Sequence, residues 1–452
     1  MSLPVVQKKG DIILGGLFSL HDMVMEPSLS FTSEPPPAHC TRFNFRTFRW
    51  MQTMIFAIEE INRDGKLLPN ITLGYKIFDS CSTPHQALKA VMELVGNEKV
   101  SGVEVETESQ GTCRGTVPAV IGDGGSTQSL VVARFLGVFQ VPQVSYFSSC
   151  ACLSDKKEFP AFLRTMPSDL FQVDAMVQLV KHFGWTWVGV IAGDDAYGLG
   201  GANIFADEVR KLGACVALHE VIPKNRAQIT ISSIISKIRS SGARVILVFA
   251  VEQDAAALFD EALREGLTGI QWLANNIQPW QLLRYIKQVE YISSFGHEIK
   301  FDENGDPAAM YDLVNWQMGQ DGGIEFVTIG KFDETTTVGK QKLQIEEPII
   351  VWNGNETNIP LSVCSSICPA GTRKSIRPNF PVCCHDCVVC TAGEISNHTD
   401  AIECVRCLPE FWSNDERTAS KGNHYHLYAD PGNHLYSVAG CCSPYSTKND
   451  TT

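Results

Sequence analysis

The chain has 452 residues, of which 44% are hydrophobic, and this length allows two or three domains with sizeable cores. Its formal net charge of −13 argues against a nucleic-acid partner, because phosphate contacts need a basic surface. The longest apolar runs, such as Val245–Val251, fall far below the roughly 20 residues that a membrane span requires.

Residues 11–274 alternate between strand and helix patterns. Continuous apolar runs predict buried strands at 12–18, 73–79, 117–121, 141–147, 187–192, 216–222, 244–250 and 270–274. Apolar residues three to four apart predict helices at 47–62, 84–96, 127–137, 169–183, 199–212, 228–240 and 252–265. Repeated strand–helix units form parallel sheets, and these are too many for one compact sheet, so we predict two α/β lobes.

After Asn275 the pattern changes to one helix, at 279–289, followed by strands at 298–302, 311–317 and 324–331. The polar tail 420–452 contains His424, His426, His434, Cys441 and Cys442. A metal site in this tail is the alternative to a disordered segment, which we favour.

Eight cysteines gather in one short segment, at Cys364, Cys368, Cys383, Cys384, Cys387, Cys390, Cys404 and Cys407. The last four have the CxxC…CxxC spacing of a zinc ribbon. The adjacent pair Cys383-Cys384 suits no single tetrahedral site, however, and small segments poor in apolar residues need covalent staples. We therefore favour disulfides over zinc.

Four N-glycosylation sequons also favour a secretory route, at Asn70, Asn355, Asn397 and Asn449. No signal peptide is visible, because a strand pattern begins almost at once and has no cleavage-site pattern. Disulfides and sequons indicate secretion, which is inconsistent with the lack of a visible signal peptide. The simplest expectation is that the N-terminus is incomplete.

The segment Gly122–Thr127 follows a predicted strand and opens the helix 127–137. Glycines let a ligand approach the backbone, and the first helical N–H groups with the Ser126 hydroxyl then form an anion site. An ordinary strand-to-helix turn is the alternative. No Gly-Lys-Ser/Thr follows, which argues against a nucleotide loop.

Two further residues have both a structural and a functional interpretation. Asp169 follows Ser168 at the expected start of a helix, and from the residues alone we favour a capping role for it. Tyr197 is either a half-buried interface aromatic residue or a ring that packs against a ligand. The lobes contain no nucleophile elbow, metal-ligand trio or catalytic motif that we can find, so we do not predict an enzyme.

Several stretches, in chain order, resemble the extracellular part of class C G-protein-coupled receptors. They are Phe56–Asn62, Pro142–Tyr146, Phe162–Pro167, Phe183–Gly189, Trp272–Ala274, Cys368–Lys374 and Phe411–Asn414. The resemblance covers about residues 11–419 and is strongest to fish olfactory and vomeronasal type-2 receptors and to the calcium-sensing receptor. It implies a bilobal, periplasmic-binding-protein-like Venus-flytrap domain that closes on a ligand. A nine-cysteine domain would relay this closure to a seven-helix bundle.

The expected fold is therefore an α/β flytrap, incomplete, followed by a small disulfide-rich β module. Its expected parts are a leader without signal peptide (1–10), lobe 1 (11–165), the first part of lobe 2 (166–274), a lobe-closing segment (275–355), the cysteine-rich domain (356–419) and an unrelated tail (420–452). Three departures from the family stand out. A long block of the family is absent between Ala274 and Asn275. Ser420 stands where the ninth cysteine is expected. The sequence beyond Ser420 resembles nothing in the family, and the seven-helix bundle is absent.

The resemblance implies an amino acid or related zwitterion as ligand, with no cofactor and with calcium as a lesser co-ligand. The ligand carboxylate would meet lobe 1 and the ammonium lobe 2, at Gly124, Gly125, Ser126, Phe147, Ser149, Asp169 and Tyr197. The resemblance also implies a homo- or heterodimer at the plasma membrane, on its extracellular side. A heterotrimeric G protein would be reached only through the absent bundle.

The resemblance implies five disulfides, namely Cys40–Cys81, Cys215–Cys383, Cys364–Cys384, Cys368–Cys387 and Cys390–Cys404. Cys407 lacks its usual partner unless Cys441 or Cys442 substitutes. Cys113 lies in a loop that can bridge two protomers in relatives. Cys150 and Cys152 have no assigned partner. The alternative function is a truncated, non-signalling isoform, secreted or retained, that acts as a decoy or dimer partner or misfolds.

Overall fold

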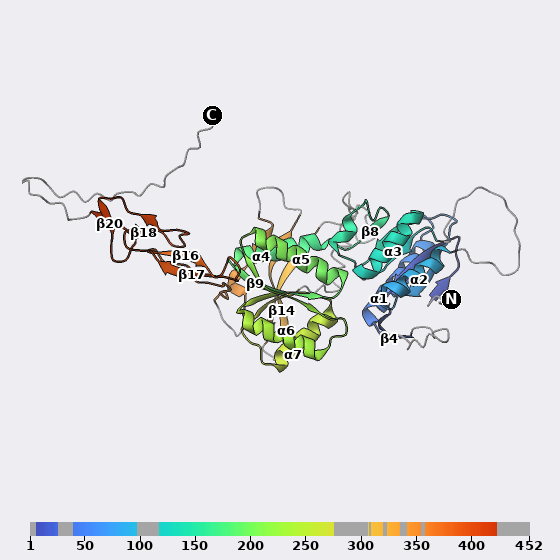
Figure 1. The fold of residues 1–452 in the computed structure, drawn as a ribbon. Helices are drawn as coiled ribbons and strands as arrows, with labels where there is room; N and C mark the ends of the chain where they lie inside the picture. The colour runs from blue at the N-terminus through green and yellow to red at the C-terminus, as the bar shows by residue number, and fades with distance from the viewer. Residues whose placement is uncertain are drawn as a thin grey trace, which may run out of the picture.

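A computed structural model describes residues 6–25, 39–96, 117–274, 306, 309–319, 323–334, 341–353 and 358–422. Within these ranges two α/β lobes and a narrow cysteine-rich module follow one another along the molecule (Figure 1). Lobe 1 is drawn in blue to teal, lobe 2 mainly in green to yellow, and the module in red. The predicted elements at 279–289 and 298–302, the histidines of the tail, Asn275, Cys113, Asn355, Asn449 and Cys441–Cys442 lie outside the described residues.

Lobe 1 is built on a six-stranded sheet in the order β1-β5-β2-β6-β7-β8. Its strands are β1 (Val6–Lys8), β2 (Ile12–Phe18), β5 (Leu73–Asp79), β6 (Val120–Ile121), β7 (Gln143–Ser145) and β8 (Phe162–Arg164). Only the pairing of β1 with β5 is antiparallel. The helices are α1 (Phe45–Arg63), α2 (Pro84–Val95) and α3 (Ser126–Phe139), and a hairpin of β3 (His21–Met25) and β4 (His39–Phe43) precedes α1.

Neighbouring residues of β2 explain why these strands are continuously apolar. Leu17 packs in a core with α2 and α3, whereas Phe18 packs in a second core with α1. Successive side chains of a strand point to opposite faces, so a sheet covered on both faces needs apolar residues at every position.

Lobe 2 repeats this arrangement on a four-stranded parallel sheet in the order β10-β9-β11-β12. Its elements are α4 (Asp169–His182), β9 (Trp187–Gly193), α5 (Ala196–Lys211), β10 (Cys215–Ile222), α6 (Gln228–Ser241), β11 (Val245–Phe249), α7 (Glu252–Arg264) and β12 (Gln271–Ala274). Helices α4 and α5 cover one face, and α6 and α7 cover the other (Figure 1). The predicted two-lobed α/β architecture is therefore confirmed.

The chain after residue 306 returns to lobe 2. It forms an antiparallel sheet of β13 (Met310–Met318), β14 (Ile324–Asp333) and β15 (Leu343–Ile345), followed by a short 3-10 helix at Glu347–Ile349. Ile329, Ile350 and Trp352 of this segment are buried in the same core as α4 and α5. The segment thus completes lobe 2 rather than forming a separate unit.

The cysteine-rich module consists of three two-stranded pairings, each antiparallel. They join β16 (Thr372–Ile376) to β17 (His385–Val389), β18 (Glu394–Ile395) to β19 (Val405–Arg406), and β20 (Phe411–Ser413) to β21 (Ser420–Gly422). The last strand begins at Ser420, so the module's β-structure extends past the predicted boundary at 419. Disulfides join Cys364 to Cys384, Cys368 to Cys387, and Cys390 to Cys404.

These bonds bear on the choice between zinc and disulfides. Three of the four cysteines with zinc-ribbon spacing, Cys387, Cys390 and Cys404, are disulfide-bonded and so are not thiolate ligands. The structure also contains the other two implied bonds, Cys40–Cys81 in lobe 1 and Cys215–Cys383 between lobe 2 and the module. No helix in the described ranges combines the length and the apolar character that crossing a membrane requires.

Candidate functional site

The glycine-containing loop leads directly into the N-terminus of α3. Gly122 has φ +111°, and a Cβ there would lie 2.0 Å from the carbonyl oxygen of Leu17. Gly124 lies against the ring of Tyr146, where a Cβ would come within 2.7 Å of the ring carbon Cε2. Gly125 is the N-cap residue and provides no side-chain cap. The N–H groups of the first helical residues therefore remain available to an anion at a helix end that carries partial positive charge.

Asp123 lies beneath this loop and was not predicted as a site residue. Its carboxylate is buried, and Oδ1 accepts hydrogen bonds from the Gly125 N–H at 3.0 Å and the Ser19 hydroxyl at 3.1 Å. Its carbonyl oxygen accepts from the hydroxyls of Ser129, Ser145 and Ser148. Burial raises the pKa of Asp123, and hydrogen bonds to its carboxylate from Ser80, the Gly125 N–H and Ser19 oppose the rise. Asp123 thus fixes the loop through Oδ1 and its carbonyl oxygen, while Oδ2 has no hydrogen-bond partner among the described residues.

A short run of hydrogen bonds connects the loop to the start of α4. The Cys150 N–H donates to Ser126 Oγ at 3.2 Å, and the Asp169 N–H donates to the Ser149 carbonyl oxygen at 2.8 Å. Because Ser149 and Cys150 are adjacent, the predicted residues Ser126, Ser149 and Asp169 are brought together. Ser126 Oγ is an acceptor in this contact, which leaves its O–H to donate elsewhere.

Asp169 is the first residue of α4 but does not cap it. The N-cap is Ser168, whose side chain accepts from the Leu170 N–H at 3.4 Å. The capping role that the residues alone suggested for Asp169 is therefore wrong, because Ser168 takes that position. Asp169 itself is completely buried, and neither carboxylate oxygen has a hydrogen-bond partner of ordinary geometry among the described residues.

The surroundings of Asp169 disfavour its ionised form. Burial raises the pKa of Asp169 to about 7, opposed by the Ser149 hydroxyl and the charge of Arg164 and reinforced by the charge of Asp195. A buried carboxylate without a partner is costly, and such groups concentrate at functional sites. Within the described residues, Asp169 is therefore a buried carboxylate whose charge no cationic side chain pairs.

The N-terminus of α5 in lobe 2 contacts the N-terminus of α3 in lobe 1. The Ala196 N–H donates to Thr127 Oγ1 of α3 at 3.0 Å, a direct contact between the lobes. The next residue is Tyr197, which is half-buried and packs on Phe249 with ring centroids 4.7 Å apart. Its ring therefore borders the site, although part of its surface belongs to the lobe 2 core. Asp195 caps α5, and burial raises its pKa.

Phe147 lies on the lobe 1 side, two residues before Ser149. It is half-buried and packs against Trp50 of α1, with ring centroids 4.9 Å apart. Trp50 in turn contacts Tyr146, which stacks on Phe18. This row of rings gives lobe 1 an apolar wall next to the glycine loop.

A second set of contacts joins the lobes at the N-terminus of α7. Gln253 Nε2 donates to Asp22 Oδ2 at 3.2 Å, and Arg46 of α1 forms an exposed ion pair with Glu252. The lobes therefore touch both at the α3–α5 contact and at the α1–α7 contact.

One disulfide near the site was not assigned from the sequence. Cys150 is bonded to Cys152, two residues away, at the start of a 3-10 helix that spans Ala151–Ser154. Cys150 is buried and Cys152 is exposed. A C-x-C spacing is too short to suggest a pairing by itself, since bonded cysteines usually lie far apart in sequence.

Comparison with known proteins identifies both parts of the chain. The family described as "Receptor family ligand binding region" matches residues 49–279, about half of the chain. The family described as "Nine Cysteines Domain of family 3 GPCR" matches residues 359–413.

Among individual proteins, the chain is similar to extracellular calcium-sensing receptors. Those of Sus scrofa and Homo sapiens are each 30% identical over 556 positions, which cover 87% of this chain and 51% of the receptor. Taste receptor type 1 member 2 of Homo sapiens is 27% identical over 535 positions, covering 91% and 62%. This chain thus spans about half the length of the calcium-sensing receptors it matches. The 556 aligned positions exceed its 452 residues, as expected if a block is absent from it. The expected closeness to fish olfactory receptors stays a prediction.

Proposed function

This chain belongs to the class C family of G-protein-coupled receptors and comprises their ligand-binding region and nine-cysteine domain, and from that premise we propose that it binds an amino acid or related zwitterion between its lobes. Its relatives are receptors rather than enzymes. The proposal concerns the ligand class and the consequence of binding, which the family alone leaves open.

The observation that carries the proposal is the unpartnered carboxylate of Asp169. A ligand ammonium group would give it a charge-assisted hydrogen bond and remove the cost of burying a lone charge. The ring of Tyr197, which follows the α5–α3 contact, would add a cation–π contact of about 0.5–2 kcal/mol.

The lobe 1 side supports the other half of a zwitterion. The N-terminus of α3, with Gly124, Gly125 and Ser126, presents backbone N–H groups and a hydroxyl to an anion. Hydrogen bonds through Ser149 and Cys150 connect this helix end to Asp169, which supports a single small molecule with adjacent carboxylate and ammonium groups. Phe147 would cover its apolar part.

Such a ligand would act by favouring the closed arrangement of the lobes. A molecule bound by α3 on one side and by α4 and α5 on the other stabilises the state in which both sides meet. The Cys215–Cys383 bond would carry the movement of lobe 2 into the module. We place the chain on the extracellular side of the plasma membrane, in a dimer of class C receptors whose seven-helix domain contacts the G protein.

The test is differential scanning fluorimetry of the purified chain with the twenty L-amino acids, with L-lactate and ethylamine as half-ligands. A ligand that binds only the folded chain raises its melting temperature by mass action. We expect at least one amino acid to give a shift, L-lactate and ethylamine to give none, and Asp169→Asn to abolish the response. Asp174→Asn, on the same helix but paired with Gln178, is the matched control.

A melting temperature that no amino acid raises would refute the proposal, as would equal shifts with L-lactate. Calcium as a co-ligand is tested by repeating the panel with and without calcium chloride.

A further inference from the structure

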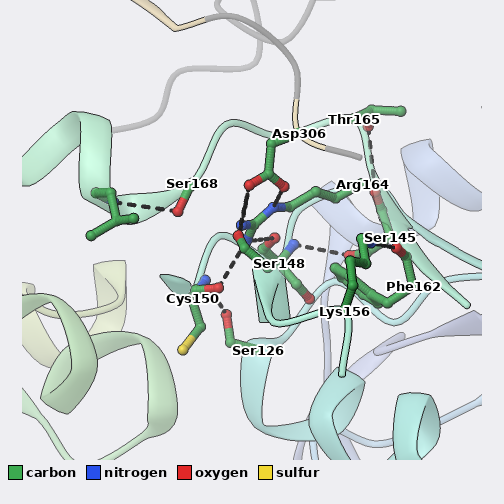
Figure 2. A network of polar contacts seen from close by, with 12 residues as sticks. Ser126, Ser145, Ser148, Cys150, Lys156, Phe162, Arg164, Thr165, Ser168 and Asp306 are labelled. Atoms are coloured by element: carbon green, nitrogen blue, oxygen red, sulfur yellow. Dashed lines mark hydrogen bonds and ion pairs between the residues drawn. The ribbon is translucent and has the colours of Figure 1, made fainter. Parts of the chain in front are cut away.

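A buried ion pair lies behind the candidate site, between two residues that are 142 positions apart in sequence. Arg164, in β8, is completely buried, and its guanidinium is bidentate to Asp306, with Nε to Oδ1 at 2.6 Å and Nη2 to Oδ2 at 3.0 Å (Figure 2). A planar guanidinium matches a carboxylate in this geometry, which is the arrangement that offsets the cost of burying both charges.

The ion pair also forms hydrogen bonds with the loop 148–154, which follows β7. Arg164 Nη1 donates to the carbonyl oxygens of Cys150 at 2.8 Å and Ser148 at 3.3 Å. From the other side, the Ser154 hydroxyl donates to Asp306 Oδ2 at 2.6 Å. Figure 2 shows Asp306, Ser148 and Cys150 around the guanidinium of Arg164. The ends of the loop 148–154 are therefore both bonded to one ion pair.

This loop is the one that connects the residues of the candidate site. Ser149 accepts the N–H of Asp169, and the Cys150 N–H donates to Ser126 Oγ. Arg164 holds the carbonyl groups of Ser148 and Cys150, which flank Ser149 on either side. A shift of the guanidinium would move Ser149 relative to both Ser126 and Asp169.

We propose that Arg164 and Asp306 are positioning residues of the ligand site, whose ion pair sets the loop 148–154 and whose charges tune the affinity of Asp169 for an ammonium group. The inference rests on the proposed function for the identity of the ligand. Neither residue stood out in the sequence as a site residue, because Arg164 ends the short strand β8 and Asp306 ends a turn-type sequence, Glu303–Asp306.

The electrostatic part of the proposal has a definite sign. Burial is the main reason that the pKa of Asp169 is raised to about 7, the Arg164 charge lowers it, and the Asp195 charge raises it. Removing the positive charge with Arg164→Gln should raise this pKa further. Removing the opposing negative charge with Asp306→Asn leaves Arg164 less neutralised and should lower it.

The experiment measures the pH midpoint of Asp169 in two independent ways. The first is the pH dependence of the melting-temperature shift caused by the L-amino acid that gives the largest shift in the panel. The second needs no ligand: the carboxyl carbon resonance of Asp169 is followed by NMR in chain labelled at aspartate and assigned by its loss in Asp169→Asn. Arg134→Gln and Glu158→Gln, which break an exposed ion pair on lobe 1, are the matched controls.

We expect the midpoint to move up in Arg164→Gln, down in Asp306→Asn, and to stay in place in both controls. Arg164→Lys keeps the charge but loses the bidentate geometry, so its midpoint should stay near that of the unchanged chain while the ligand-induced shift falls. If Arg164→Gln does not fold, Asp306→Asn and Arg164→Lys still decide the question.

Midpoints that stay equal in all variants, or that move in the same direction in Arg164→Gln and Asp306→Asn, would overturn the inference and leave the pair a purely structural contact. Failure of the proposed function looks different. In that case no amino acid shifts the unchanged chain, while the NMR midpoints still report whether the pair tunes Asp169.

Discussion

The backbone N–H of Ala196 donates to Thr127 Oγ1 at 3.0 Å, so the first turn of α5 in lobe 2 is bonded to the first turn of α3 in lobe 1. Both residues directly adjoin positions that we propose bind the ligand, Tyr197 and Ser126. The contact exists only when the lobes approach one another. We therefore expect it to strengthen in the closed arrangement that the proposed ligand would stabilise.

Replacing Thr127 with Val should weaken closure without unfolding either lobe. The substitution removes one partly buried hydrogen bond, with a net effect of about 0.5–1.5 kcal/mol. Since this bond forms only between the lobes, we expect the amino-acid concentration for a half-maximal thermal shift to rise about 2- to 10-fold. Thr127→Ser keeps the hydroxyl and should respond like the unchanged chain. Equal responses of Thr127→Val and Thr127→Ser would show that the contact plays no part in closure.

Asp169→Asn should make the ligand-free chain more stable while removing its response to amino acids. The folded-state pKa of about 7 lies above the ordinary value of 3.8, so the carboxyl loses stability when it ionises. The unfolding free energy of the unchanged chain should therefore fall as the pH rises from about 4 to about 7, by an amount on the order of a few kcal/mol. The variant should lack this fall.

Melting curves of both chains across this pH range check the prediction, with Asp174→Asn as the control. A variant that is less stable than the unchanged chain above pH 7 would show that the Asp169 carboxylate already has a stabilising partner in the ligand-free chain.

The Cys150–Cys152 bond should contribute little to global stability. In the chain-entropy description, a bond that closes so short a loop restricts the unfolded chain by only about 1–2 kcal/mol. The double variant Cys150→Ser/Cys152→Ser should fold, with a slightly lower melting temperature and a weaker amino-acid response, because the backbone of Cys150, which bonds to Ser126 and Arg164, is less restrained without the disulfide. Peptide mapping without reduction should recover 150 and 152 in one internally bonded peptide. A peptide that joins either residue to another cysteine would contradict the assignment.

The sequence predicted the lobes well because their strands are covered on both faces. Val245–Phe249 is buried at every position, and a run of this kind has few alternatives to a central parallel strand. The elements that were not predicted are short strands at the margins, such as β1 and the hairpin β3–β4, whose residues are largely exposed or half-buried. Their pairing depends on tertiary contacts rather than on an apolar pattern.

The candidate site was predictable only in part. Glycines before a helix are a local signal that identified the α3 loop, whereas Ser-Asp at a helix start suggested only a cap, and the ligand role predicted for Asp169 came from the resemblance. Asp123, Arg164 and Asp306 act through burial and through contacts with residues distant in sequence, as in the pairing of Arg164 with Asp306. No local pattern distinguishes such residues from surface charges. Asp169 shows the same limit, since its lack of a partner is a property of the folded site alone.

The junction between lobe 2 and the module should be fixed by one disulfide and one serine acting together. Ser362 accepts the N–H groups of Thr186 and Trp187 through its carbonyl oxygen at 3.0 Å, and its side-chain oxygen accepts the Arg244 N–H at 3.2 Å. Cys215 lies at the start of β10, beside this contact, and its bond to Cys383 closes a loop of 168 residues. A bond that closes so long a loop stabilises by up to about 5 kcal/mol in the chain-entropy description.

The double variant Cys215→Ser/Cys383→Ser should therefore keep both lobes folded and responsive to amino acids, yet exchange the amide hydrogens of Thr186 and Trp187 faster. Faster exchange is expected because the segment around Ser362 then opens locally without global unfolding. The matched control is Cys390→Ser/Cys404→Ser, which removes a bond inside the module and should leave these two amides protected. Hydrogen-exchange mass spectrometry of the peptide that contains 186 and 187 makes the comparison. Unchanged protection in the first variant would mean that Ser362 alone fixes the junction, and that lobe movement reaches the module without the disulfide.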